Sequence, residues 1–148
     1  MKWLALLFAL FFVLSPSQVG PAFGQSGPAS GPATPLTPSP DDRAKQWLTL
    51  VDDGNSTEAW KQVAAQWKDK LSQERFVRML TTVRGPLGAM TSRNLKAVNL
   101  VKTLPGMRDG QYTVVRFDSA FAHKASAMET VTLISDNGAW SVVDYHIE

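Results

Sequence analysis

The 148-residue sequence contains no cysteine. A chain without cysteine cannot form disulfides, thiolate metal sites or a cysteine nucleophile. It also offers no cysteine at which a lipid could be attached after cleavage of an N-terminal signal. The folded protein must therefore gain its stability from a packed hydrophobic core.

Histidine is scarce, and the common catalytic motifs are missing. His123 and His146 are the only histidines, and their spacing does not match a metal-binding motif. The sequence has no Ser-x-x-Lys, Gly-x-Ser-x-Gly or His-Glu-x-x-His motif and no Walker-type phosphate-binding loop. We therefore expect no metal and no cofactor, predict no catalytic residue, and favour a non-enzymatic protein.

The chain has little net charge and no long run of one sign. Its formal charge is +2, and removal of Lys2 with the N-terminal segment reduces it to +1. This excess is too small to predict binding to nucleic acid or to an anionic membrane. We expect no nucleic-acid partner, and contact with a membrane only through the N-terminal segment during export.

That N-terminal segment has the parts of a secretory signal peptide. Lys2 precedes the apolar run from Trp3 to Leu14, which is shorter than the roughly 20 residues that span a bilayer. Small residues follow, and cleavage after Gly24 fits best. Residues 1–24 are thus predicted to be a signal peptide, and the protein is expected to be periplasmic or secreted.

Residues 25–40 are rich in glycine, proline, serine and alanine and are uncharged, a composition typical of a linker. The rest of the chain, residues 41–148, has the length of one ordinary domain with a single core.

Helical spacing of apolar residues dominates the first half of this domain. The predicted helices run from Ser39 to Gly54, from Asn55 to Leu71 and from Ser72 to Arg84. Ser39 and Ser72 are expected to be N-caps, Asn55 with Glu58 has the spacing of a capping box, and Gly85 is a predicted left-handed stop. Trp47, Trp60 and Trp67 fall on the apolar faces and are expected to lie in the core.

The second half alternates apolar and polar residues, as strands do. The predicted strands are residues 95–102, 111–121, 125–135 and 140–147, and turn-forming residues at 105–110 and 136–138 separate them. This order predicts an α+β fold in which two to three N-terminal helices pack on one face of a curved, four-stranded antiparallel sheet.

Five segments carry a resemblance to a known family: WLTLVDDG, VRGPLGAMTSR, LPGMRDGQY, AMETVTL and NGAWSVVDYHI. In this order they resemble the exported bacterial family known as domain of unknown function 4019 (DUF4019), from about Ala44 to Ile147. The chain departs from that pattern at Arg108 and Asp144. The resemblance implies an exported soluble domain and no known chemistry. More loosely, the order of elements is similar to the cone-shaped fold of nuclear transport factor and ketosteroid isomerase, or to a cystatin-like fold.

Glu129 is the most informative polar residue. It has the same strand parity as Val131 and Leu133, so it is predicted to point into the core. A buried carboxylate must be paired or neutralised, and Arg84 or Arg93 is the expected partner. A perturbed buried acid occurs in structural ion-pair networks as well as in active sites, so it does not by itself indicate catalysis. We therefore favour a structural ion pair over a catalytic acid.

Three functions remain open at this point. The first is a non-enzymatic periplasmic or secreted domain that binds a small ligand or a protein partner through Arg84, Arg93, Glu129 and His146, with any pocket expected between the helices and the sheet and lined by tryptophan, phenylalanine and methionine. The second is an assembly module that forms a homodimer through the sheet. The third is a small acid-base enzyme of the cone fold that uses Glu129 or His146, with a Glu129–His146 pair as a minority hypothesis.

Overall fold

The computed structural model describes residues 37–148. The predicted signal peptide and nearly all of the predicted linker therefore lie outside the described residues. Within residues 37–148, no helix is both long and apolar enough to cross a membrane.

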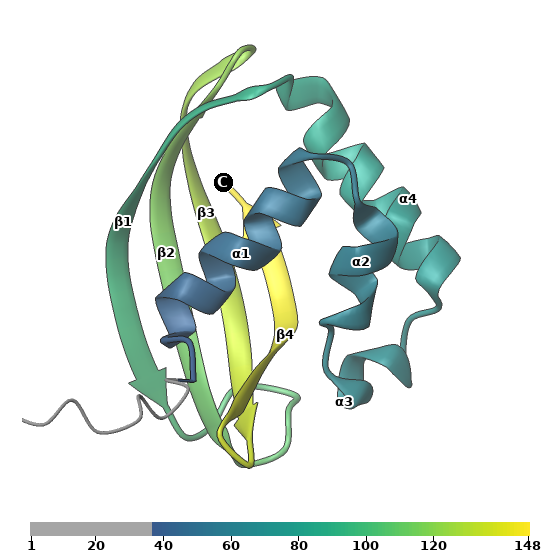
Figure 1. Ribbon diagram of the computed structural model, residues 1–148, viewed down its shortest axis with the longest axis vertical. Helices are drawn as coiled ribbons and strands as arrows, with labels where there is room; N and C mark the ends of the chain where they lie inside the picture. Colours follow the sequence, from purple (N-terminus) through teal and green to yellow (C-terminus); the bar gives the residue numbers. More distant parts are fainter. Residues whose placement is uncertain (1–36) are drawn as a thin grey trace, which may run out of the picture. The chain divides into compact units, whose positions relative to one another are not determined.

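The helices occupy the first half of the described chain, as predicted (Figure 1). They are α1 (Pro40–Asp52), α2 (Ser56–Lys61), α3 (Ala65–Lys68) and α4 (Gln73–Arg84), followed by a single 3₁₀ turn, η1 (Gly85–Leu87). The side chain of Ser39 accepts a hydrogen bond from the Asp42 N–H, and that of Ser72 accepts one from the Arg75 N–H, so both predicted N-caps are confirmed. Asn55 makes no side-chain cap bond, and the predicted capping box is wrong.

The single helix predicted from Asn55 to Leu71 is wrong, because it is divided into α2 and α3. Between them the chain is extended and pairs with the last strand: the Ala64 N–H donates to the carbonyl of Val142 over 2.8 Å, and the Val142 N–H donates to the carbonyl of Gln62 over 3.0 Å. These bonds replace helical ones and cover one edge of the sheet.

Gly85 is not a left-handed stop, because its φ is −51° and the chain continues into the 3₁₀ turn. The left-handed residue is Gly88, with a φ of 74°. A Cβ atom at Gly88 would lie 3.1 Å from atoms of Ala122 and His123, so both the conformation and the space favour glycine there.

The four strands form one antiparallel sheet in the order β1-β2-β3-β4 (Figure 1). They are β1 (Met90–Val101), β2 (Gln111–Phe121), β3 (Lys124–Asp136) and β4 (Ala139–Ile147). β1 starts five residues earlier than the predicted residue 95. Its pairing with β2 shifts at Thr91 and again at Lys96, and these bulges interrupt the alternation by which a strand is recognised. The α+β fold, with N-terminal helices packed on a four-stranded antiparallel sheet, is confirmed.

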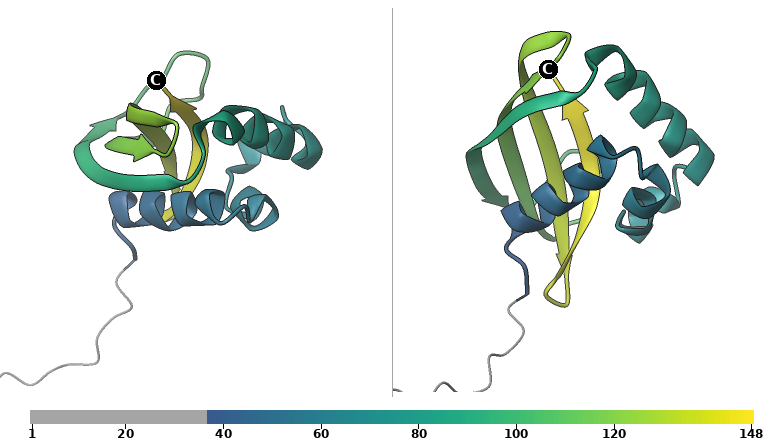
Figure 2. Two further views of the ribbon diagram at one scale, coloured as in Figure 1. Left: turned by 90° about the horizontal axis from the view of Figure 1, so that it is seen from above. Right: turned by 45° about the horizontal axis from the view of Figure 1, so that its top comes forward.

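Helix α1 lies across one face of the sheet, which we call the covered face (Figures 1 and 2). Trp47 is fully buried there and donates a hydrogen bond to the carbonyl of Ala59 over 3.0 Å. The expected core position is thus confirmed for Trp47, whereas Trp60 and Trp67 are half-buried and pack against Phe76 at the margin of the core. The sheet contributes Val115, Phe117, Val131, Leu133, Val142 and Tyr145 to this core.

The opposite face, which we call the uncovered face, carries the alternate residues of the strands. Tyr112, Ile134 and Val143 form a small second core there with Ala64. Leu104 and Met107, from the loop between β1 and β2, pack on this second core. Among residues 37–148, no helix lies over the remainder of the uncovered face.

Candidate functional site

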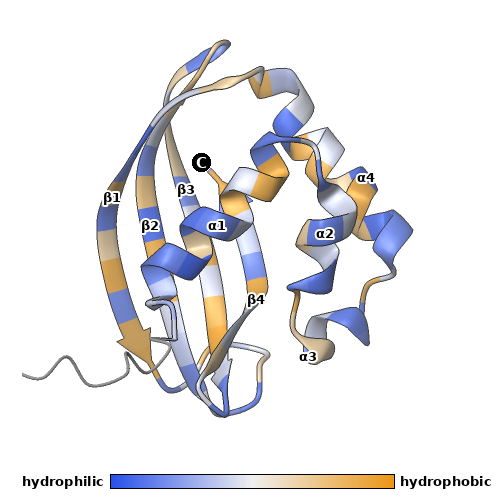
Figure 3. Ribbon diagram, in the orientation of Figure 1, coloured by the Kyte–Doolittle hydropathy of each residue, from blue (hydrophilic) through white to orange (hydrophobic). Residues whose placement is uncertain are grey.

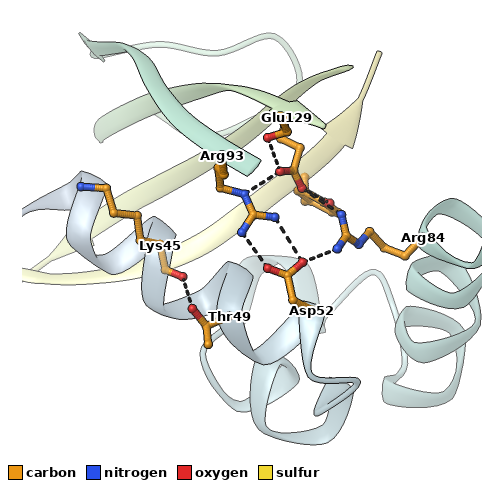
Figure 4. Close-up of polar contacts among 8 residues, drawn as sticks. Lys45, Thr49, Asp52, Arg84, Arg93 and Glu129 are labelled. Atoms are coloured by element: carbon orange, nitrogen blue, oxygen red, sulfur yellow. Dashed lines mark hydrogen bonds and ion pairs between the residues drawn. The ribbon is translucent and has the colours of Figure 1, made fainter. Parts of the chain in front are cut away.

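Glu129 lies in the middle of β3, on the covered face, and none of its surface is exposed. Arg93 of β1 donates from Nε to Glu129 Oε2 over 2.6 Å, and Arg84 at the end of α4 donates from Nη1 to Oε1 over 3.2 Å (Figure 4). The predicted pairing of Glu129 with these two arginines is therefore confirmed.

Asp52, the last residue of α1, joins the same group. Arg93 donates to its two carboxylate oxygens over 2.7 and 3.2 Å, and Arg84 donates to it as well (Figure 4). Asp52, Arg84, Arg93 and Glu129 form what we call the charged cluster, which contains two positive and two negative charges. Asp52 was not predicted from the sequence, although it lies four residues after Leu48 and so continues the buried stripe of α1.

Two hydroxyl groups complete the hydrogen bonding of Glu129. Ser119 of β2 donates to Oε2 over 2.6 Å, and Tyr145 of β4 donates to Oε1 over 2.8 Å. Each oxygen of Glu129 thus accepts two hydrogen bonds. The guanidinium of Arg84 also lies 4.4 Å from the centre of the Phe121 ring. The carboxylate is fully paired by protein groups.

These contacts fix the charge states within the cluster. Burial acts to raise the pKa of Glu129, but hydrogen bonds from Arg93 and Ser119 outweigh it, and the pKa falls below the ordinary value. Burial raises the pKa of Tyr145, and the neighbouring charge of Glu129 raises it further. At neutral pH Glu129 is therefore ionised and Tyr145 protonated, so Tyr145 donates the hydrogen bond between them and Glu129 accepts it.

His146 lies apart from the charged cluster. It stands opposite Thr130 in the register of β3 and β4, whereas Glu129 stands opposite Ile147. Neighbouring residues of a strand point to opposite faces, so His146 belongs to the uncovered face, where its side chain is 48% exposed. The proposed Glu129–His146 acid-base pair is therefore wrong.

A hollow of about 570 Å³ lies on the uncovered face beside His146. Val114, Thr130 and Thr132 belong to the strands at its floor, and Leu104 and Met107 reach it from the loop between β1 and β2. We call this the open-face hollow. Its size falls in the range of small-molecule sites, and its lining combines apolar side chains with a similar number of polar and charged ones.

Charged groups occupy two sides of the open-face hollow. Arg116 comes from β2, and Asp144, His146 and Glu148 come from β4 and the residue after it. His146 Nδ1 lies 3.1 Å from Asp144, and Nε2 lies 3.9 Å from Glu148. Arg116 takes part in none of the ion pairs formed within residues 37–148. Arg116 was not predicted as a site residue from the sequence. It lies between the core residues Val115 and Phe117, so its side chain points to the opposite face of the sheet.

The part of the chain that the structure describes contains no group of three histidine, aspartate or glutamate side chains placed to hold a metal ion.

One protein family matches residues 43–145 of the chain, and it is described as a protein of unknown function (DUF4019). The match covers both the charged cluster and nearly all of the open-face hollow. No curated protein matches the chain.

Proposed function

The chain belongs to the DUF4019 family, and we propose from its own geometry that it is a non-enzymatic binding domain whose ligand occupies the open-face hollow. The observation that supports this most is Arg116, a cation without an ion-pair partner in residues 37–148, at the side of a hollow with apolar walls. A guanidinium of this kind binds a carboxylate through two parallel hydrogen bonds.

The charges of the hollow indicate the class of ligand. Arg116 of β2 and His146 of β4 both stand opposite Thr130 of β3, so their backbones lie about 9–10 Å apart, and Asp144 lies two residues away from His146 along β4. A small zwitterion fits this arrangement if its carboxylate meets Arg116, its ammonium meets Asp144 and Glu148, and its apolar body packs on Leu104 and Met107. A short apolar peptide has these features.

The charged cluster is less suited to bind a ligand than the open-face hollow. Glu129 is fully buried and accepts four hydrogen bonds from protein groups, so a ligand would have to displace them. Removing one partner from a buried ion pair costs about 3–5 kcal/mol. We therefore give Arg84, Arg93 and Glu129 a structural role, and of the four expected ligand-binding residues we retain His146.

The proposal includes export to the periplasm or the medium. It is supported by the signal-peptide features of residues 1–24, namely Lys2 and the apolar run that follows it. N-terminal sequencing of the protein recovered outside the cytoplasm should give Gln25 as the first residue. A protein that retains Met1 and stays in the cytoplasm would contradict this part.

Isothermal titration calorimetry with the dipeptide leucyl-leucine tests the binding function. We expect binding by the unaltered protein, weakened at least tenfold when the dipeptide is N-acetylated or C-terminally amidated, because each change removes one charge. Arg116→Gln should weaken binding by a similar factor. Arg75→Gln, at an exposed arginine of α4, is the matched control and should leave binding unchanged. Equal affinity of all three dipeptide forms, or no binding, would overturn the proposed ligand class.

A further inference from the structure

Within residues 37–148, no segment pairs with the outer side of strand β1, which is an open edge of the sheet. The sheet order places β1 and β4 at its two ends, and the segment around Val63 and Ala64 pairs with β4. β1 keeps exposed apolar side chains: Leu95 is 45% exposed, Val98 42% and Leu100 75%. Figure 3 shows this hydrophobic colour along the second half of β1. Such an edge presents backbone donors and acceptors to another strand.

The two halves of β1 differ in the features that oppose pairing with a strand of another molecule. The first half has bulges at Thr91 and Lys96, and Arg93 points inward to the charged cluster. Lys96 is held by Asp118 over 2.8 Å. Bulges, lysines and inward charges are devices by which edge strands avoid contact with other strands. The second half, Ala97 to Val101, pairs with β2 without a register shift and contains neither charge nor proline.

We propose that this second half pairs with the same segment of a second copy of the chain, in antiparallel orientation and centred on Asn99. The sequence reads alike in both directions about Asn99, with two apolar residues on each side. In this register Val98 lies opposite Leu100 of the second copy, and Ala97 lies opposite Val101. The two Asn99 side chains meet at the axis, where their amides can bond to each other.

The register explains where the pairing stops. One residue beyond the segment, Lys96 of one copy faces Lys102 of the other, and like charges that stand opposite each other disfavour pairing. The contact is therefore five residues long in each chain. It joins two four-stranded sheets into one of eight strands and leaves both open-face hollows in place. Because the interface is short compared with a standard one, the dimer should dissociate on dilution.

Cysteine cross-linking tests the register, since the natural chain has no cysteine. Residues directly opposite in an antiparallel pair have Cα atoms about 4.5–5.5 Å apart, within the range that a disulfide spans. Under mild oxidation Asn99→Cys should form a covalent dimer at least ten times faster than Asn94→Cys, which places the same substitution in the first half of β1. Equal rates would overturn the proposed register.

Light scattering after size exclusion tests the association without a cross-link. The purified protein should double in mass as its concentration rises, and Leu100→Lys should remain a monomer. Val83→Lys, at a partly exposed apolar residue of α4, is the control and should still dimerise. A protein that stays monomeric at every concentration, even if its β1 pairs with a strand of a different protein, would overturn the proposal.

Discussion

Glu129 is the residue on which the buried polar contacts converge. From β3, its carboxylate accepts hydrogen bonds from α4 and from the other three strands, and Asp52 adds α1 through the same two arginines. A charge in this position is costly to bury unless every lone pair has a donor, and here each oxygen has two. The charged cluster thus ties the helices to the sheet at one end of α1.

We predict that Glu129→Gln lowers the free energy of unfolding by about 3–5 kcal/mol, because two buried guanidinium groups lose one of their two carboxylate partners. The matched control is Asp118→Asn, which breaks the exposed pair with Lys96 and should cost at most about 1 kcal/mol. Urea unfolding followed by circular dichroism measures both. If the two substitutions cost the same, the charged cluster does not stabilise the fold as described.

The pH dependence of stability follows from the lowered pKa of Glu129. A carboxyl whose pKa is lower in the folded state contributes stability above its unfolded pKa, roughly 4.3 for glutamate, and loses it as the pH falls through the folded pKa. The difference in unfolding free energy between the unaltered protein and Glu129→Gln should therefore be constant near neutral pH and shrink below about pH 4.3. A difference that stays the same down to pH 3 would contradict an ionised Glu129.

Part of the charged cluster could be predicted from sequence, and particular residues show why the rest could not. Strand parity identified Glu129, and the need to pair a buried carboxylate identified Arg84 and Arg93 as its partners. Tyr145 was not identified because the pairing of β3 and β4 shifts at Val143, which places Val142 and Tyr145 on the same face although they are three residues apart. A bulge of this kind has no local sequence signal here, since Val142 and Val143 are alike.

At the scale of secondary structure, local capping signals and tertiary contacts compete. Ser39 and Ser72 cap their helices as their sequence context predicts. Asn55 has the same kind of context, but the helix after it is only six residues long and its cap is not formed. The extended segment that follows bonds to β4, and this long-range pairing determined the local structure. Such pairing is not visible in a local sequence window.

Ser72, whose cap is formed, can be compared directly with Asn55, whose cap is not formed. Ser72→Ala should lower the unfolding free energy by about 1 kcal/mol, because the Arg75 N–H loses its acceptor at the start of α4. Asn55→Ala removes no cap bond and should cost only a few tenths of that amount. Thermal unfolding of the two variants measures the difference. A larger loss for Asn55→Ala would show that its side chain caps α2 in solution.

At the scale of the whole molecule, the two faces of the sheet have different roles. The covered face holds the main core and the charged cluster, and their side chains contact one another. The uncovered face holds the open-face hollow, where Arg116 and His146 are accessible to a ligand. The layer order could be predicted from sequence, and so could the face of Glu129. The hollow could not, because it depends on where the loop carrying Leu104 and Met107 folds back.

Amide chemical-shift mapping tests most directly the central claim that the binding surface is the uncovered face. Leucyl-leucine is added to ¹⁵N-labelled protein, and the shifted resonances are assigned. We predict shifts at Arg116, Thr130 and His146, with Glu129 and Arg93 unchanged. Shifts confined to Glu129, Arg93 and their neighbours on the covered face would contradict the account and place the ligand at the charged cluster.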